Sequence, residues 1–496
     1  MSGGRRAVPG ARALRELVAG GTAGDAGRAG SRRIAGNAAL QLTARVLQVI
    51  SGLVTLPLLA RALGPVDFGV WVAGLAYVGL FISFTELGLT NAATMKMSAE
   101  PEHESQWLAA LSSLRMVVGL ALTVLCVAGI PLFLPDGQGV RLVALILSAA
   151  VLLAGASSLM AVFTSRLRGG VPLVIGLLQT VMWLSIVVAV SVLDAGPATL
   201  AAGYLAMLTT IAAVQVTAAR RMASLSYDGA RSRWRGLLVV ALPLGVGGLL
   251  VTVYYRIDSV LVFQLAGARE AGIYGAAYRF LDTLTFFPAA VISALMPVFA
   301  ATYTTDPART RALVQRATDL MVTLGAPAVA VALVLSPQII ELLFSAVYAR
   351  SAEVLPILMA SFLAICVGTL GGYLAPVVGL RWGIAAIAGV CVVVNVGLNL
   401  VLIPDYGAVG AAWVTSATEG LSAALLLAFS FRAMRFRPSP SRALRAVLAS
   451  AVMGGALVVV EPLGLVPALA AGAVVYAAAV LALRVVSLGE LRSLRS

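Results

Sequence analysis

Long, uninterrupted runs of apolar residues constrain this chain more than any other feature of its sequence. One run covers about residues 34–59, and similar runs recur along the 496-residue chain. A run of 18 or more apolar residues can cross a bilayer as a helix, and a soluble domain could not bury a chain that is 60% hydrophobic. Because the runs lack the alternation of barrel strands, we predict an all-α polytopic membrane protein.

The sequence predicts fourteen transmembrane helices, with connections too short to hold an inserted soluble domain. The predicted spans are residues 37–60, 69–94, 111–134, 140–163, 171–193, 198–219, 237–264, 271–301, 317–344, 353–378, 383–403, 408–430, 444–461 and 464–486. They form two six-helix bundles and two additional C-terminal helices. The chain is thus predicted to consist of a disordered basic cytoplasmic tail (1–33), the first bundle (34–219), a basic linker (220–236), the second bundle (237–430), a basic loop (431–443), the two additional helices (444–486) and a cytoplasmic tail (487–496).

The two predicted bundles carry traces of an internal repeat. An apolar helix end, a glycine turn and a glycine-aromatic helix start recur at an offset of 203 residues, where Gly64, Gly69 and Trp71 match Gly267, Gly272 and Tyr274. A second match between the two halves, at an offset of 211 residues, relates the turn at 193–196 to the turn at 403–407. Repeats of this size are typical of secondary transporters.

Arginine and lysine gather on one side of the predicted topology. The other side keeps only Arg61, Arg141, Arg269 and Arg350. By the positive-inside rule, the arginine-rich side is cytoplasmic, which places both termini in the cytoplasm. The net charge of +14 is then an orientation signal and a set of contacts for anionic membrane lipids, and we expect no nucleic-acid binding.

No set of residues for catalysis or for a metal is visible. The three cysteines and one histidine do not match the spacing of a zinc site, no Walker-type glycine loop is present, and the outer loops are too short for a catalytic domain. We therefore expect no enzyme activity, no metal and no cofactor.

Charged side chains inside the predicted spans are the candidate functional residues, because an unpaired charge in the bilayer is costly. Guanidinium groups pair well with phosphate oxygens, so the candidates for holding an anionic head group are Arg45, Arg256 and Arg279. The candidates for ion coupling or for ion pairs are Glu86, Asp258, Asp282 and Glu419.

Matching depth in the bilayer predicts two ion pairs. Arg45 and Glu86 each lie roughly 10 Å above the inner ends of their helices, and Asp258 and Arg279 lie equally deep on either side of a turn. Asp282 shares a helix face with Arg279. Each arginine either holds two helices together through an ion pair or faces a cavity, where it would attract an anionic head group.

Two further sets of residues stand out inside the spans. Asn395 and Asn399 are one helical turn apart, so they either line a polar cavity or form hydrogen bonds between helices. Pro243, Gly247 and Gly248 form the predicted hinge, because proline removes a helix hydrogen bond and glycine tolerates bending.

Three sequence patterns, in the same order, resemble a known family. They are LARALGPVDFGVW with ELGL at 86–89, YYRIDSVLVFQLAGAREAGIYGAAYRFLD at 254–282, and NVGLNLVLIPDYGAVGAAW at 395–413. From about residue 34 to 430 the chain resembles the bacterial polysaccharide flippases, the oligosaccharide flippase branch of the multidrug/oligosaccharidyl-lipid/polysaccharide exporter superfamily. The resemblance implies two six-helix bundles that face a central cavity, plus two extra helices.

The resemblance also implies a function. The expected substrate is an oligosaccharide on undecaprenyl pyrophosphate, flipped by alternating access across the bacterial cytoplasmic (inner) membrane, with H+ or Na+ as the expected coupling ion and other polysaccharide-assembly proteins as partners. It defines no coupling site in this sequence. The alternatives are a multidrug/cation antiporter of the same superfamily, and a polytopic sugar polymerase or ligase. Intramembrane arginines weigh against the first, and short outer loops against the second.

Overall fold

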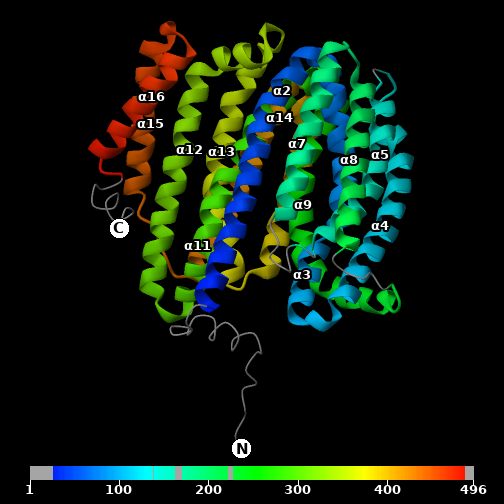
Figure 1. Ribbon diagram of the computed structural model, residues 1–496. Coiled ribbons are helices and arrows are strands. Elements are labelled where there is room, and N and C mark those ends of the chain that lie inside the picture. The colour runs from blue at the N-terminus through cyan, green and yellow to red at the C-terminus, as the bar shows by residue number, and fades with distance from the viewer. Residues whose placement is uncertain (1–25, 138, 162, 164–169, 222–226, 486–496) are drawn as a thin grey trace, which may run out of the picture.

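Figure 1 shows a computed structural model of the chain, in which long helices stand side by side. It describes residues 26–137, 139–161, 163, 170–221 and 227–485; for residues 26–50, Leu53, Pro243, Leu244 and Arg381, only the backbone is described. These described parts consist of helices and their connections without a strand, which confirms the all-α prediction.

Within the described ranges, the first half of the chain contains six α-helices and two short 3-10 helices. They are α2 (Ala26–Glu86), α3 (Leu89–Ala99), η1 (Pro101–His103), α4 (Glu104–Phe133), α5 (Val140–Ser157), η2 (Ser158–Met160), α7 (Gly170–Val192) and α8 (Pro197–Arg220).

In the part of the second half that the structure describes, η3 (Ala230–Arg233) comes first and eight α-helices follow. They are α9 (Trp234–Ala266), α10 (Ala268–Leu284), α11 (Phe286–Thr305), α12 (Pro307–Phe344), α13 (Ser351–Val377), α14 (Arg381–Ala433), α15 (Ser441–Val460) and α16 (Leu465–Ala482), with η4 (Ala346–Tyr348) after α12 and η5 (Glu461–Leu463) after α15.

Twelve helical segments in the described part are long and apolar enough to cross a membrane. Two of these segments contain a break, in α2 at Gly64 and in α14 at Gly407. A straight helix of the 61 residues in α2 would be roughly 90 Å long, about three times the thickness of the hydrocarbon core, so the chain must turn back at the break. When the two limbs of each broken helix are counted separately, the twelve segments become the fourteen predicted crossings.

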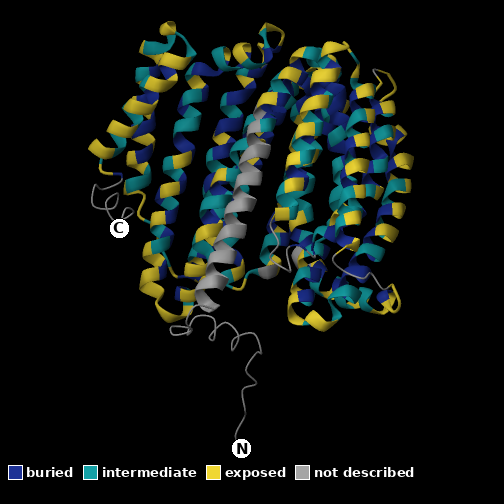
Figure 2. Ribbon diagram, in the orientation of Figure 1, coloured by how far each residue is buried: buried dark blue, intermediate teal, exposed yellow. Residues whose placement is uncertain are grey.

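The outer surface of the bundle is apolar. Figure 2 shows exposed positions along the outward faces of the peripheral helices, and they include large apolar residues such as Val124 on α4, Val459 on α15 and Val474 on α16. A soluble monomer rarely exposes such a continuous apolar surface, whereas a bilayer requires one. The additional helices α15 and α16 pack against α12 through Leu335, Leu457 and their neighbours, beside the rest of the bundle.

The predicted repeat appears in the backbone geometry. Gly64 has φ 70° and ψ 172°, and Gly267 has φ 88° and ψ 174°. A positive φ is easily adopted only by glycine, so the same turn explains the same residue in both halves. The second match, at the offset of 211 residues, is weaker in the structure. Gly196 has φ −76°, whereas its equivalent Gly407 has φ 55°.

The two halves meet where α2 crosses α10, close to the end that carries Gly64 and Gly267. A Cβ atom on Gly69 would lie 1.8 Å from the carbonyl oxygen of Ala268, and one on Gly272 would lie 1.9 Å from that of Pro65. Pro65 and Ala268 are themselves equivalent in the 203-residue repeat, so the contact is reciprocal, as at a two-fold axis. We call this contact the glycine crossing.

Hydrogen bonds add to the contact at this end of the bundle. Arg61 Nε donates to the carbonyl oxygen of Leu343 over 2.9 Å, and the Tyr348 hydroxyl donates to that of Ala60, also over 2.9 Å.

The halves touch again at the opposite end, where α2 meets α9. A Cβ atom on Gly245 would lie 2.0 Å from the carbonyl oxygen of Leu87, and Gly88 adopts φ 73° beside it. The cavities between the halves therefore lie between two close backbone contacts, one at each end of the bundle.

Candidate functional site

The first half of the chain encloses a cavity of about 490 Å³. Its wall combines aromatic, hydroxyl and amide side chains with one arginine from the second half. The lining residues are Ser51, Gly52, Thr55, Leu56, Trp71, Leu75, Gln179, Thr180, Trp183, Tyr204, Met207 and Arg279. We call this space the N-half cavity.

Three aromatic rings form one side of the N-half cavity. Trp71 stacks on Trp183 with ring centroids 6.0 Å apart, and both rings meet the edge of Tyr204 at 5.5 Å. Trp183 Nε1 donates to Thr55 Oγ1 over 3.1 Å, which fixes the indole. Sequence reasoning used Trp71 only as a repeat marker and missed Trp183 and Tyr204, because an aromatic residue in an apolar run carries no local signal of a cavity.

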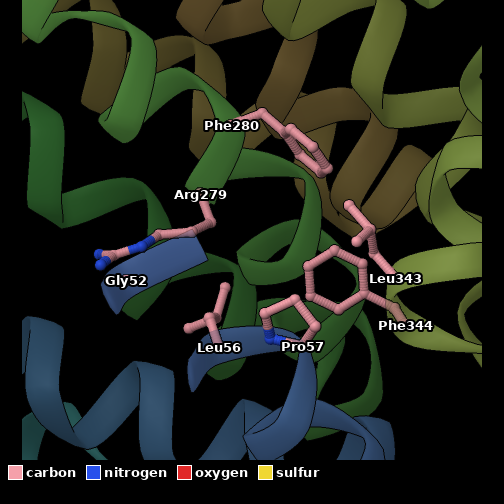
Figure 3. Close-up of a pocket in the computed structure, with 7 residues that line it drawn as sticks. All are labelled: Gly52, Leu56, Pro57, Arg279, Phe280, Leu343 and Phe344. Carbon is pink, nitrogen blue, oxygen red and sulfur yellow. The ribbon is translucent and has the colours of Figure 1, made fainter. Parts of the chain in front are cut away.

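Arg279 reaches from α10 across to α2 and joins the two halves of the chain. Figure 3 shows its side chain extending over Gly52, and a Cβ atom there would lie 2.9 Å from Arg279 Nη2. Its partner Asp282 is 3.8 Å away, and its buried Nε has no hydrogen-bond partner. Arg279 therefore lies on the wall of the N-half cavity with one N–H unpaired, and its predicted role in binding an anionic head group stays a prediction.

Arg256 and Asp282 line a separate cavity of about 260 Å³ between α9 and α10. Arg256 also reaches the first half of the chain, because a Cβ atom on Gly79 of α2 would lie 4.0 Å from Arg256 Nε. Two of the three predicted head-group arginines thus face the space between the halves. The third, Arg45, lies in α2 among the residues whose side chains are not described.

Glu86 pairs with Arg115, whose Nη1 lies 2.7 Å from Glu86 Oε2. Thr90 donates to both carboxylate oxygens. The orientation argument counts Arg115 only among the basic residues of the arginine-rich side and does not predict this pair, in which Arg115 is only 3% exposed. Its helix α4 begins at Glu104, seven residues before the predicted span, so Arg115 lies deeper in the bundle than the sequence suggested.

Asp258 lies at the centre of a buried polar cluster that joins α9, α10 and both limbs of α14. Asn399 Nδ2 donates to Asp258 Oδ1 over 2.8 Å, and Asn399 also donates to Asn395 over 3.1 Å. Thr415 Oγ1 lies 2.8 Å and the Tyr274 hydroxyl 3.3 Å from Asp258 Oδ2. The structure thus brings together three predicted residues and adds two that the sequence did not indicate.

The predicted pairing of Asp258 with Arg279 is not formed in this structure. Asp258 points toward α14, whereas Arg279 points toward α2. Equal depth along two helices does not fix the directions of their side chains, so depth alone cannot predict that two side chains meet. No basic side chain of the described residues pairs with Asp258, while Asn395 Nδ2 and Asn399 Oδ1 beside it lack partners.

Glu419 is the fourth predicted acidic residue and lies one helical turn beyond Thr415. It is 4% exposed, lies beside Tyr254 and Tyr255, and its Oε1 has no hydrogen-bond partner.

The predicted hinge lies in α9, which runs through Gly247 and Gly248 without a break. A side chain added at Gly248 would meet open space, and the side chain of Pro243 is not among those described. Bending of α9 at this position therefore stays a prediction.

The sequence matches the models of two known protein families. A family model described as "Polysaccharide biosynthesis protein" matches residues 34–303, more than half of the chain, and a second one, "MatE", matches residues 243–401. No curated protein sequence matches the chain.

Two solved structures illustrate the similarity in fold. "Lipid II flippase MurJ, inward closed conformation" has a TM-score of 0.70 at 14% identity, with 89% of this chain and 97% of that chain covered. An inward-facing "multidrug resistance MATE family transporter of the MOP superfamily" has a TM-score of 0.62 at 14% identity, with 79% and 98% covered. These two structures confirm the predicted fold, and the two family models bear out the predicted family resemblance. The two proteins are named as a flippase and a transporter.

Proposed function

The chain belongs to the polysaccharide biosynthesis protein family, and on that premise we propose that it flips a lipid-linked oligosaccharide across the membrane. The observation that carries the proposal is the position of Arg279, a guanidinium with an unpartnered Nε on the wall of the N-half cavity. A pyrophosphate joins the sugar to its undecaprenyl carrier, and it is the anion that such a group binds best.

The N-half cavity suits the sugar part of this substrate. Its volume of about 490 Å³ lies in the range of small-molecule sites. Gln179, Thr180 and Ser51 offer hydrogen bonds to sugar hydroxyls, and the aromatic wall offers a surface to the apolar faces of the rings. The prenyl tail would stay outside, against the apolar surface that faces lipid.

The two contacts between the halves support alternating access. Opening the contact at Leu87 and Gly245 would admit the substrate from one side, while the glycine crossing keeps the other side closed. Opening the crossing would release the substrate. Rocking of two repeated units about a central site is the general mechanism of such transporters.

We propose that the lower end of the bundle in Figure 1, with α3 and the basic loop after α14, faces the cytoplasm of a bacterial cell. The support is the concentration of arginine on this side. A periplasmic reporter fused at Pro438 should be inactive, and an active one would reverse the orientation.

The Asp258 cluster is the proposed site of coupling to H+ or Na+. An uncompensated carboxylate buried in a membrane protein binds a cation or a proton, because its charge is otherwise too costly. Carboxylate, amide and hydroxyl oxygens suit a hard cation. Asn395, Asn399 and Thr415 would supply these oxygens around Asp258, and the unpartnered Asn399 Oδ1 leaves room in the network for one more interaction.

Asp258→Asn should remove coupling while preserving the fold, because the amide keeps the shape of the protonated carboxyl group. A potential of 100 mV supplies about 2.3 kcal/mol per charge, equivalent to about fifty-fold in a gradient. In proteoliposomes, an imposed Na+ or proton gradient should accelerate the parent and leave Asp258→Asn at its undriven rate. Asp282→Asn is the matched control and should still respond. A full response of Asp258→Asn would exclude the cluster as the coupling site.

The main rival function is multidrug export, which the MatE match at residues 243–401 favours. Two measurements in cells with and without the gene separate it from flipping. Loss of the gene should make lipid-linked oligosaccharide accumulate in the cytoplasmic leaflet and leave growth in ethidium unchanged. Increased ethidium sensitivity without accumulation would support the rival.

A further inference from the structure

A third cavity lies away from the space between the halves, where α14 ends. Its volume is about 650 Å³, and it is lined by Ala428, Phe431, Arg432, Arg435, Phe436 and Arg437. We call it the arginine pocket. Residues 428–445 contain five arginines and no acidic residue.

The three arginines of the pocket carry uncompensated charge. Arg432, Arg435 and Arg437 are exposed, and none of them has a carboxylate partner among the described residues. Orientation in the membrane requires basic residues on this side, but it does not require them to share one cavity. Three like charges at close range repel each other unless an anion binds between them.

The turn that builds the pocket is held in a costly backbone conformation. Phe436 N donates to the carbonyl oxygen of Phe431 over 2.8 Å, and Arg435 N donates to that of Arg432 over 3.0 Å. This arrangement closes the helix with Arg435 at φ 49°, a position that usually holds glycine. An arginine kept there at the expense of stability indicates a function for its side chain.

The chain on either side of the turn is also fixed. The rings of Phe431 and Phe436 meet edge to face with centroids 5.4 Å apart. Beyond the turn, Gln315 of α12 exchanges two hydrogen bonds with the backbone of Ser439, over 2.9 and 2.7 Å. The backbone that carries the three arginines is therefore held in place on both sides of the turn.

We propose that the arginine pocket binds the phosphate group of an anionic phospholipid. The apolar span of α14 ends at Ala433, which places the pocket at the level of the lipid head groups. Arginine pairs with phosphate oxygens through two parallel hydrogen bonds. The apolar atoms of Ala428, Phe431 and Phe436 fit the glycerol and upper acyl carbons, so lipid fits the lining better than free phosphate does.

The test uses the full-length protein in detergent, with its melting temperature followed as lipid is added. Phosphatidylglycerol should stabilise the parent, and phosphatidylcholine with the same acyl chains should not. Replacing Arg432, Arg435 and Arg437 together by Gln should weaken the phosphatidylglycerol effect on the order of a hundredfold in lipid concentration, since each arginine contributes about fivefold. The matched control replaces the exposed Arg309, Arg311 and Arg316, at the same end of the bundle, by Gln.

The control separates a site from diffuse attraction. Equal losses in the two triple variants would overturn the proposal, as would equal stabilisation of the parent by inorganic phosphate. Arg435→Gly tests whether misfolding explains a weaker lipid response, because glycine adopts the positive φ at this position without strain. We expect this variant to melt no lower than the parent without lipid and to respond less to phosphatidylglycerol. An undiminished response in this variant would also contradict the proposal.

Discussion

Alanine at Gly272 should abolish transport while leaving the individual helices intact. The added Cβ atom would lie 1.9 Å from the backbone oxygen of Pro65, so α2 and α10 must move apart for it to fit. Moving the helices apart costs about 3 kcal/mol of free energy. This cost would reduce the population of the closed glycine crossing, and with it the transport rate, on the order of a hundredfold. Gly69→Ala should behave in the same way, because its contact with Ala268 is equivalent.

The opening itself can be measured with an introduced cysteine. Ala60 is buried beside Tyr348, and the native Cys126, Cys366 and Cys391 are buried as well. Ala60→Cys should react slowly with a membrane-impermeant maleimide in the parent and quickly when Gly272→Ala is also present. Gly420→Ala is the matched control, since a side chain there meets nothing within 4 Å. Slow labelling and normal transport in Gly272→Ala would show that the crossing is not a gate.

The spans and turns of this fold could be predicted because their causes are local. Apolar runs define the helices, and a glycine with positive φ defines each matching turn, at Gly64 and at Gly267. The reciprocal crossing could not be predicted in the same way. Gly69 and Gly272 are visible as a repeat, but only the folded chain shows that each packs against the other copy.

The candidate site was predicted in part, for a physical reason. A charged residue in an apolar run is conspicuous, so Asp258 and Arg279 were found. Their partners were not found, because Thr415 and Tyr274 are ordinary residues for a membrane helix and a side chain's direction depends on tertiary packing. The pairing of Arg115 with Glu86 was not predicted either, because α4 begins seven residues before the predicted span and buries Arg115 in the bundle.

Arg279→Ala should have the second large effect. If the guanidinium binds the pyrophosphate in a cavity that excludes most water, its loss removes about 3 kcal/mol of charge-assisted hydrogen bonding, on the order of a hundredfold in rate. Arg279→Lys should recover only part of it, because an ammonium cannot form the two parallel bonds. Gly52→Leu, which pushes the guanidinium aside, should resemble Arg279→Ala. Arg235→Ala, which removes an exposed arginine in the first turn of α9, should keep the parental rate.

The most direct measurement is the flipping of lipid-linked oligosaccharide in proteoliposomes. A fluorescent substrate in the inner leaflet becomes accessible to an external quencher only after it has crossed the bilayer. We expect the parent and Arg235→Ala to move it at the same rate, well above that of protein-free vesicles. Arg279→Ala, although inserted and folded, should approach the protein-free rate. No acceleration by the parent would contradict the proposed function, and an Arg279→Ala variant as fast as the parent would show that this arginine does not recognise the substrate.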